Sequence, residues 1–268
     1  MSDTILTLPP PPADARVAYG SDPNQFFDLR RPKPDLQPHE KRSNDLYPLV
    51  INIHGGFWRA AYNLDHASHL CSALTSRGLA TANLEYRRVG NEGGTWPNTF
   101  ADIRNAYNFL RQSAGQHKFD PQKVLVMGHS AGGQLALCLA RHEPNVTRVV
   151  SLAGVVDLQR AFQLHLSNDA VVEFLHGTPD QVPDHYREAD PMQLSIPQAR
   201  QRLIHGSVDD VVPPAFSRDY VAAKQRRTGN EKEDVRLLEI SGADHFDLID
   251  PRSRAWEQVE RIALGLLD

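Results

Sequence analysis

The sequence predicts an α/β protein with a doubly wound, mostly parallel β-sheet and a small cap insertion. Three observations support this fold class. Short apolar runs typical of buried parallel strands recur along the chain, and segments with apolar residues at helical spacing alternate with them. One of these runs ends at Gly128, and a helical pattern begins almost at once around Ser130. Such an immediate change from strand to helix is typical of a βα unit.

Length and composition indicate one domain with one core. The chain has 268 residues, of which 40% are hydrophobic and 23% are charged, as is usual for a globular protein. The four prolines at positions 9–12 can only be extended or disordered. We therefore expect a proline-rich N-terminal tail over residues 1–18 and a single domain over residues 19–268.

Charge and cysteine content exclude several classes of partner. The formal net charge is −4 and the isoelectric point is about 6.3, so neither nucleic acid nor an anionic membrane is an expected partner. Cys71 and Cys138 occupy apolar positions of predicted helices, where reduced thiols act as small core residues. The chain also starts without signal-peptide features. We expect a cytoplasmic protein, and the oligomeric state, a homodimer included, stays open.

The first half of the chain contains the expected strands and helix in this order. Residues 25–29 (QFFDL) predict an antiparallel strand at the sheet edge, and residues 49–53 (LVINI) predict a buried strand. Residues 67–74 have helical spacing and end before Gly78, which suits a helix C-cap. Residues 79–84 (LATANL) predict the next strand.

The second half repeats this alternation with one interruption. We expect helices over 100–110, 216–223 and 256–266 and strands over 124–127, 149–152, 203–204 and 235–240. Residues 157–197 separate two of these strands and carry scattered aromatic residues. An insertion of about forty residues in a compact domain is usually functional, so we expect a small cap over the strand ends.

The turn around Ser130 has the spacing G-x-S-x-G. Glycines at 128 and 132 allow a sharp reversal that presents the serine hydroxyl at the end of a strand. The helix that follows directs free N–H groups and its dipole toward this point, where they would stabilise a developing negative charge. Taken alone, the five residues also fit an ordinary βα turn.

A serine nucleophile needs a base, and the base needs a carboxylate that orients it. The loop after the strand at 203–204 carries Asp209 and Asp210, and the loop after the strand at 235–240 carries His245. The order Ser130, Asp209, His245 puts each side chain just past the C-terminal end of a strand, where side chains of open α/β sheets meet. Asp210 is the alternative acid, otherwise a loop carboxylate or a helix cap.

Four motifs together resemble the α/β-hydrolase superfamily. They are GHSAGG at the serine, HGSVDDVVP at the acid, GADHF at the base, and HGGFW where esterases carry an HGGG-type motif. HGGFW combined with GHSAGG and HFDLI is similar more specifically to the kynurenine formamidase (arylformamidase) branch. Members of that branch hydrolyse N-formylkynurenine in tryptophan catabolism. The resemblance implies the α/β-hydrolase fold and the catalytic residues Ser130, Asp209 and His245, with Asp209 favoured over Asp210.

The same resemblance implies an oxyanion hole. The backbone N–H groups of Gly56, Phe57 and Ala131 would hold the oxyanion, while His54 and Gly55 would support the loop. Phe57 stands where esterases often have a third glycine. Because the hole needs only backbone N–H groups, this difference leaves catalysis intact.

Several side chains are candidates for the substrate pocket. Trp58, Phe162 and Phe174 could line an aromatic-binding pocket, although Trp58 fits core packing equally well. Asp157 and Asp190 in the cap would either recognise a substrate amine or be solvated loop charges. The histidines form no HExxH pattern, and the sequence contains no CxxC, G-x-G-x-x-G or P-loop pattern, so we expect no metal and no cofactor.

The sequence thus predicts a cofactor-free serine hydrolase that cleaves a small acyl amide or ester through an acyl-enzyme. The resemblance implies an aryl formamide such as N-formylkynurenine as the substrate. Two alternatives remain. One is a general carboxylesterase of short acyl esters, and the other is a catalytically inactive binding protein with the hydrolase fold.

Overall fold

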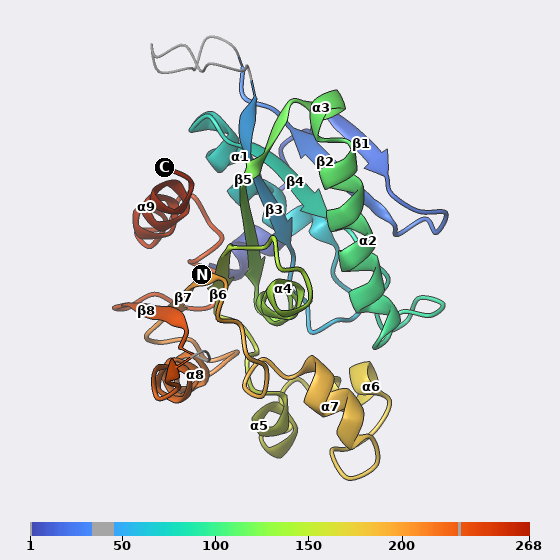
Figure 1. Ribbon diagram of the computed structural model, residues 1–268, viewed down its shortest axis with the longest axis vertical. Helices are drawn as coiled ribbons and strands as arrows, with labels where there is room; N and C mark the ends of the chain where they lie inside the picture. Colours follow the sequence, from blue (N-terminus) through green and yellow to red (C-terminus); the bar gives the residue numbers. More distant parts are fainter. Residues whose placement is uncertain (1, 34–45, 230–231) are drawn as a thin grey trace.

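The computed structural model describes residues 2–33, 46–229 and 232–268, and the strands in these ranges form one eight-stranded sheet (Figure 1). The strand order is β1-β2-β4-β3-β5-β6-β7-β8. β1 and β2 are antiparallel to their neighbours, and all other pairs are parallel. The strands are β1 (Ala15–Ala18), β2 (Phe26–Arg30), β3 (Tyr47–Ile53), β4 (Ala80–Leu84), β5 (Phe119–His129), β6 (Arg148–Leu152), β7 (Arg200–Gly206) and β8 (Asp234–Ile240).

Helices cover both faces of the sheet, as predicted for a doubly wound fold. Figure 1 shows α9 on one side of the central strands and α2 and α4 on the other. The helices are η1 (Ser2–Leu6), η3 (Leu64–Ala67), α1 (Ser68–Ser76), α2 (Asn98–Gln112), α3 (Ala114–His117), α4 (Ala131–His142), α5 (Leu158–Gln163), α6 (Ala170–Leu175), α7 (Pro183–Ala189), α8 (Ala215–Gln225) and α9 (Trp256–Leu267). Within the described ranges, no helix is both long and apolar enough to cross a membrane.

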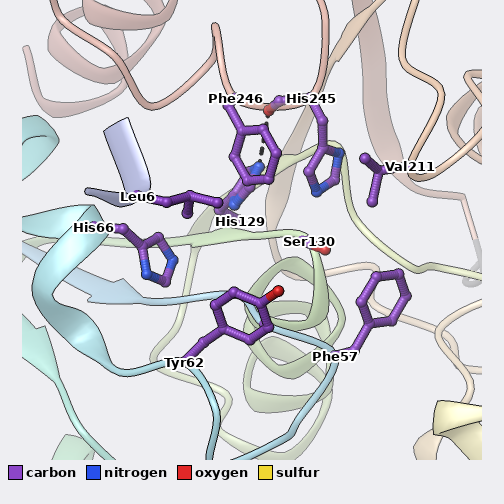
Figure 2. Close-up of a pocket in the computed structure, with 10 residues that line it drawn as sticks. Leu6, Phe57, Tyr62, His66, His129, Ser130, Val211, His245 and Phe246 are labelled. Carbon is purple, nitrogen blue, oxygen red and sulfur yellow. Dashed lines mark hydrogen bonds between the residues drawn. The ribbon is translucent and has the colours of Figure 1, made fainter. Parts of the chain in front are cut away.

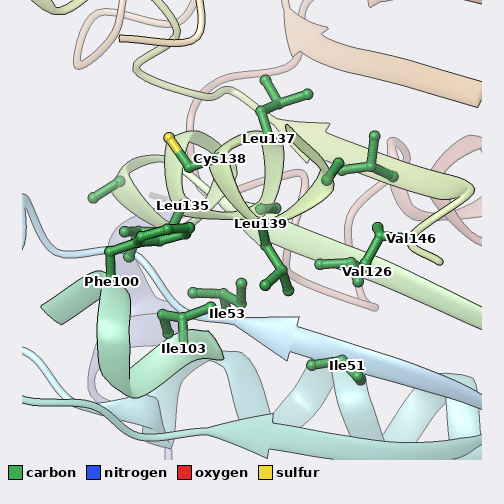
Figure 3. Close-up of a cluster of buried hydrophobic side chains, with 14 of the residues drawn as sticks. Ile51, Ile53, Phe100, Ile103, Val126, Leu135, Leu137, Cys138, Leu139 and Val146 are labelled. Atoms are coloured by element: carbon green, nitrogen blue, oxygen red, sulfur yellow. The ribbon is translucent and has the colours of Figure 1, made fainter. Parts of the chain in front are cut away.

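The core consists of two layers because neighbouring side chains of a strand point to opposite faces. On one face, Ile51 and Val126 pack with α2, α4 and α8, and Figure 3 shows this cluster around Leu135. On the other face, Val50 and Leu125 pack with η1, α1 and α9. The apolar runs of β3 and β5 are continuous because both faces of these strands are buried.

Part of the predicted N-terminal tail belongs to the domain, which corrects the expected boundary at residue 19. Residues 15–18 form β1, which pairs with β2, and Ile5 of η1 is fully buried in the layer with α9. The strand predicted over residues 25–29 is antiparallel, but β1 covers it and is the true edge. β1 is hard to recognise in the sequence because this strand is short and alternates between half-buried and exposed residues.

The segment predicted as a cap, residues 157–197, contains the short helices α5, α6 and α7, which Figure 1 shows gathered at one end of the molecule. Its side chains pack on the main domain. The Phe174 ring stacks on the Trp58 ring with 4.6 Å between ring centroids, and the Phe174 carbonyl accepts a hydrogen bond from Trp96 N. The insertion is therefore firmly attached beside α2 and α4.

Candidate active site

Ser130 lies in a strained turn between β5 and α4. Its φ of 55° and ψ of −120° are unusual for a residue with a side chain, and such a conformation costs about 1–3 kcal/mol. A Cβ atom at Gly128 would lie 2.1 Å from the Gly132 carbonyl oxygen, and one at Gly132 would lie 2.0 Å from the Ile53 carbonyl oxygen. The turn therefore requires both glycines of the motif, and it places Ser130 at the N-terminus of α4.

His245 and Asp209 form a buried hydrogen-bonded pair. His245 Nδ1 lies 2.7 Å from Asp209 Oδ2. The other carboxylate oxygen of Asp209 accepts hydrogen bonds from the backbone N–H groups of Val211 and Val212 at 2.9 and 2.8 Å. Asp210, the alternative acid, is exposed. The structure thus brings Asp209, and not Asp210, to the histidine.

A second histidine, His205, also contacts Asp209. His205 Nε2 lies 3.2 Å from Asp209 Oδ2 and 2.9 Å from the Val212 carbonyl oxygen. Burial raises the pKa of Asp209, but hydrogen bonds from His205 and His245 outweigh burial and hold this pKa well below its usual value. Asp209 therefore stays ionised and keeps the Nδ1–H tautomer of His245, which leaves Nε2 to act as a base. The motif at the acid does not by itself reveal this contact of His205 with Asp209.

His129, the variable residue of the serine motif, holds the loop that carries the base. Figure 2 shows the hydrogen bond from His129 Nε2 to the His245 backbone carbonyl, which is 3.0 Å long. Burial and the neighbouring rings of His245 and His66 lower the pKa of His129 well below its usual value, so the ring is neutral. Sequence reasoning missed this contact because it joins residues 116 positions apart.

Ser130 and His245 line the same cavity, which has a volume of about 170 Å³ (Figure 2). Its other lining residues are Leu6, Gly56, Phe57, Tyr62, His66, His129, Val211 and Phe246. Burial lowers the pKa of His66 to about 3, so His66 is neutral like His129. With neutral imidazoles among apolar side chains, the cavity suits a small uncharged group.

The HGGFW loop lies against the serine. A Cβ atom at Gly55 would lie 3.0 Å from Ser130 Cβ, and Gly56 and Phe57 line the cavity. Within the described ranges, the backbone N–H groups of Gly56, Phe57 and Ala131 donate no hydrogen bond to a protein acceptor. Phe57 has a positive φ of 50°, a conformation that the glycine usual at this position adopts easily. These three N–H groups are therefore free to bind an oxyanion.

The predicted aromatic pocket is wrong. Trp58 and Phe174 are buried against each other, and Trp58 Nε1 donates to Gln134 Oε1 at 3.0 Å. Phe162 packs against the same core, and none of the three lines the cavity. Trp58 thus adopts its alternative, core-packing role. The cavity walls come from η1, the HGGFW loop, η3 and the segment that leads into it, the turn around Ser130 and the loops after β7 and β8, and not from the cap.

The two cap aspartates do not line the cavity either. Asp157 accepts a hydrogen bond from Arg160 N at 2.9 Å and thereby caps α5. Asp190 is 1% exposed rather than solvated, and burial together with nearby Asp157 raises the pKa of Asp190 to about 7. In the described part of the chain, no group of three or more His, Cys, Asp or Glu side chains is arranged to hold a metal ion.

Comparisons with known proteins point to esterases. The BD-FAE family model matches residues 35–223. Esterase LipC of Mycobacterium tuberculosis is 29% identical over 94% of this chain, and isoprenylcysteine alpha-carbonyl methylesterase ICME of Arabidopsis thaliana is 28% identical over 87% of it. The chain spans only 64% and 56% of the lengths of these two relatives.

Solved structures of esterases share the fold. Esterase B from Lactobacillus Rhamnosis superimposes with a TM-score of 0.76 at 20% identity, covering 99% of this chain and 90% of that one. A truncated carbohydrate esterase from gut microbiota gives a TM-score of 0.76 at 21% identity, covering 95% of this chain and 98% of the other. At such low identity the likeness concerns the fold, which is that of the α/β-hydrolases.

Proposed function

The chain belongs to the BD-FAE family, and we propose that it is a serine carboxylesterase that cleaves small, uncharged acyl esters. One observation carries this proposal. Ser130, in its strained turn, lines the same cavity as His245, whose Nδ1 is held by the ionised Asp209. A nucleophile, a base with its orienting acid and free N–H donors thus surround one small site.

The proposed reaction follows from these positions. Ser130 Oγ attacks the ester carbonyl carbon while His245 Nε2 takes its proton, and Asp209 stabilises the imidazolium that forms. The N–H groups of Gly56, Phe57 and Ala131 bind the oxyanion of the tetrahedral intermediate. His245 then protonates the departing alkoxide as the C–O bond breaks. Water, deprotonated by the same ring, releases the acid from Ser130.

The relatives support the ester alternative better than the arylformamide that the motifs suggested. LipC and ICME are both named as esterases, and the residues that we expected to hold an aryl group lie in the core instead. The small cavity of about 170 Å³ favours short acyl or alcohol groups. Cleavage of N-formylkynurenine remains a prediction from the sequence, and the binding protein without catalysis remains the alternative from another class.

A substrate panel tests the proposal. We expect hydrolysis of p-nitrophenyl acetate and butyrate with a kcat/KM that exceeds that for N-formylkynurenine, and loss of turnover in Ser130→Ala. A fluorophosphonate probe should label the wild-type chain at Ser130 and leave Ser130→Ala unlabelled. Faster turnover of the formamide than of either ester would favour the arylformamidase. Absence of both labelling and turnover would favour the binding protein.

A further inference from the structure

A buried charged cluster surrounds the first residue of the HGGFW loop and does not line the substrate cavity. It consists of His54, Glu85 and Arg88 with the ring of Tyr86, and their exposed fractions are 0%, 2%, 4% and 0%. His54 directly follows the last residue of β3, and the other three residues follow the end of β4. Neither the proposed reaction nor the core packing explains why charged groups are buried here, although burial of charges is costly.

Both ring nitrogens of His54 face oxygen atoms. Nε2 lies 3.0 Å from Glu85 Oε1, and Nδ1 lies 2.7 Å from the Gly55 carbonyl oxygen. A neutral imidazole has one N–H donor and one acceptor, whereas the imidazolium has two donors. A backbone carbonyl can only accept, so Nδ1 must carry a proton. The charge of His54 then depends on whether Glu85 accepts or donates at Nε2.

Glu85 acts as an acceptor on all sides. Its carboxylate also accepts hydrogen bonds from the backbone N–H groups of Leu64 and Tyr86 at 3.2 and 3.0 Å. Arg88 Nη2 lies 3.0 Å from Glu85 Oε1. Burial raises the pKa of Glu85, but His54, Arg88 and the Tyr86 N–H outweigh it and lower this pKa below its usual value. Glu85 therefore acts as the acceptor at Nε2 as well, so both ring nitrogens of His54 face an oxygen that accepts.

The surroundings of the His54 ring also favour a cation. The Tyr86 ring stacks on it with 4.5 Å between centroids and an interplanar angle of 20°, a geometry that suits a cation on an aromatic face. The Tyr86 hydroxyl donates to the His54 carbonyl oxygen at 2.8 Å. The ring of His66, which is neutral, also lies near His54, with 5.7 Å between the ring centroids.

We propose that His54 is a buried imidazolium that polarises the Gly55–Gly56 peptide and thereby strengthens the Gly56 N–H as an oxyanion donor. The Gly55 carbonyl and the Gly56 N–H belong to one conjugated peptide group. A charged donor on the carbonyl draws electron density toward the oxygen and leaves the N–H more positive. His54 thus acts through the loop as a positioning residue, a role that rests on the proposed esterase function.

Nuclear magnetic resonance of the chain labelled with ¹⁵N-histidine tests the charge without any substrate. In the wild type at pH 8, one histidine should have both ring nitrogens protonated, and this signal should disappear in His54→Gln. In Glu85→Gln, the same histidine should lose one proton at pH 8. A singly protonated His54 in the wild type would overturn the proposal, whatever the activity.

Steady-state kinetics tests the role in catalysis. Glu85→Gln and His54→Gln should each lower kcat on p-nitrophenyl acetate roughly tenfold while KM changes less than about twofold. The matched variant Glu239→Gln, which breaks an exposed ion pair with Arg218, should leave both constants unchanged. Unfolding transitions show whether each variant folds. If either Glu85→Gln or His54→Gln fails to fold, the kinetics of the other variant test the role of His54. Wild-type kcat in a folded variant would contradict the role of His54. If the wild type itself hydrolyses no ester, the esterase function fails, while the spectrum still reports the charge.

Discussion

His129 Nε2 lies 3.0 Å from the backbone carbonyl oxygen of His245, so the residue before the nucleophile holds the loop that carries the base. The pKa of His129 is depressed by burial, so the ring is a neutral donor at Nε2. The turn around Ser130 and the loop that carries His245 are therefore joined by this hydrogen bond in addition to their packing. A 1 Å displacement of a base can cost about a hundredfold in rate, so this bond matters for the reaction.

Replacement of His129 should accordingly impair catalysis more than binding. We expect His129→Phe, which keeps the bulk but loses the donor, to lower kcat on p-nitrophenyl acetate by roughly tenfold or more with little change in KM. His129→Gln, whose amide can still donate to the carbonyl, should lose less. Equal rates for the wild type and a folded His129→Phe would show that packing alone holds His245.

The two adjacent aspartates should differ sharply. Asp209→Asn removes the charge that fixes the tautomer of His245, and we expect kcat to fall by about 10³–10⁴-fold. The matched change Asp210→Asn alters an exposed side chain and should leave kcat within about twofold. Ester hydrolysis by the two purified variants, measured at the same pH, compares the residues directly. A severe loss at Asp210 alone would reverse the assignment of the acid.

The sequence predicted those parts of the fold and the site that depend on local patterns. Continuous apolar runs predicted β3 and β5. The glycines on either side of Ser130 predicted the sharp turn there, since few other residues fit that turn. The pairing of Asp209 with His245 agreed with the order of the motifs. In contrast, the sequence did not reveal β1, whose alternation is short and weak.

Contacts between distant segments could not be read from the sequence. Trp58 follows the oxyanion loop directly, yet its indole turns toward Gln134 of α4, and only the three-dimensional path of the loop shows this. Leu6 precedes four prolines and looked like part of a tail, but η1 folds back to the cavity. A substrate pocket built from segments far apart in the chain leaves no local pattern, so its residues were assigned wrongly.

Asp190 should make stability depend on pH. Its pKa is raised from 3.8 to about 7, first by burial and then by Asp157. Between these two values the folded chain holds a proton that the unfolded chain has lost, so stability falls as pH rises through this window and levels off above it. Asp190→Asn removes the titrating group. We therefore expect the variant to gain about 4 kcal/mol over the wild type between pH 4 and pH 8.

Urea unfolding at pH 4 and pH 8 measures this gain. The control Asp180→Asn removes a carboxylate that is exposed in the same insertion, and it should change stability equally at the two pH values. A constant difference between Asp190→Asn and the wild type across this range would show that Asp190 is ionised in the folded protein.

Leu6 should limit the size of the group that the cavity accepts. Leu6 lines the cavity from η1, which is anchored by the fully buried Ile5. Removing the Leu6 side chain should extend the cavity without moving Ser130 or His245. We expect Leu6→Ala to raise kcat/KM for p-nitrophenyl hexanoate relative to acetate by about 10- to 100-fold, since each buried methylene contributes about 0.8 kcal/mol. Leu6→Trp should have the opposite effect.

Leu8 provides the matched control, because it packs against the same apolar layer but does not line the cavity. Leu8→Ala should leave the ratio of hexanoate to acetate hydrolysis unchanged, even if it lowers stability. A parallel series of acetate esters with longer alcohols separates the two ends of the substrate. If the alcohol series responds to Leu6→Ala and the acyl series does not, Leu6 faces the leaving group. An unchanged ratio in both series would show that η1 does not limit the substrate.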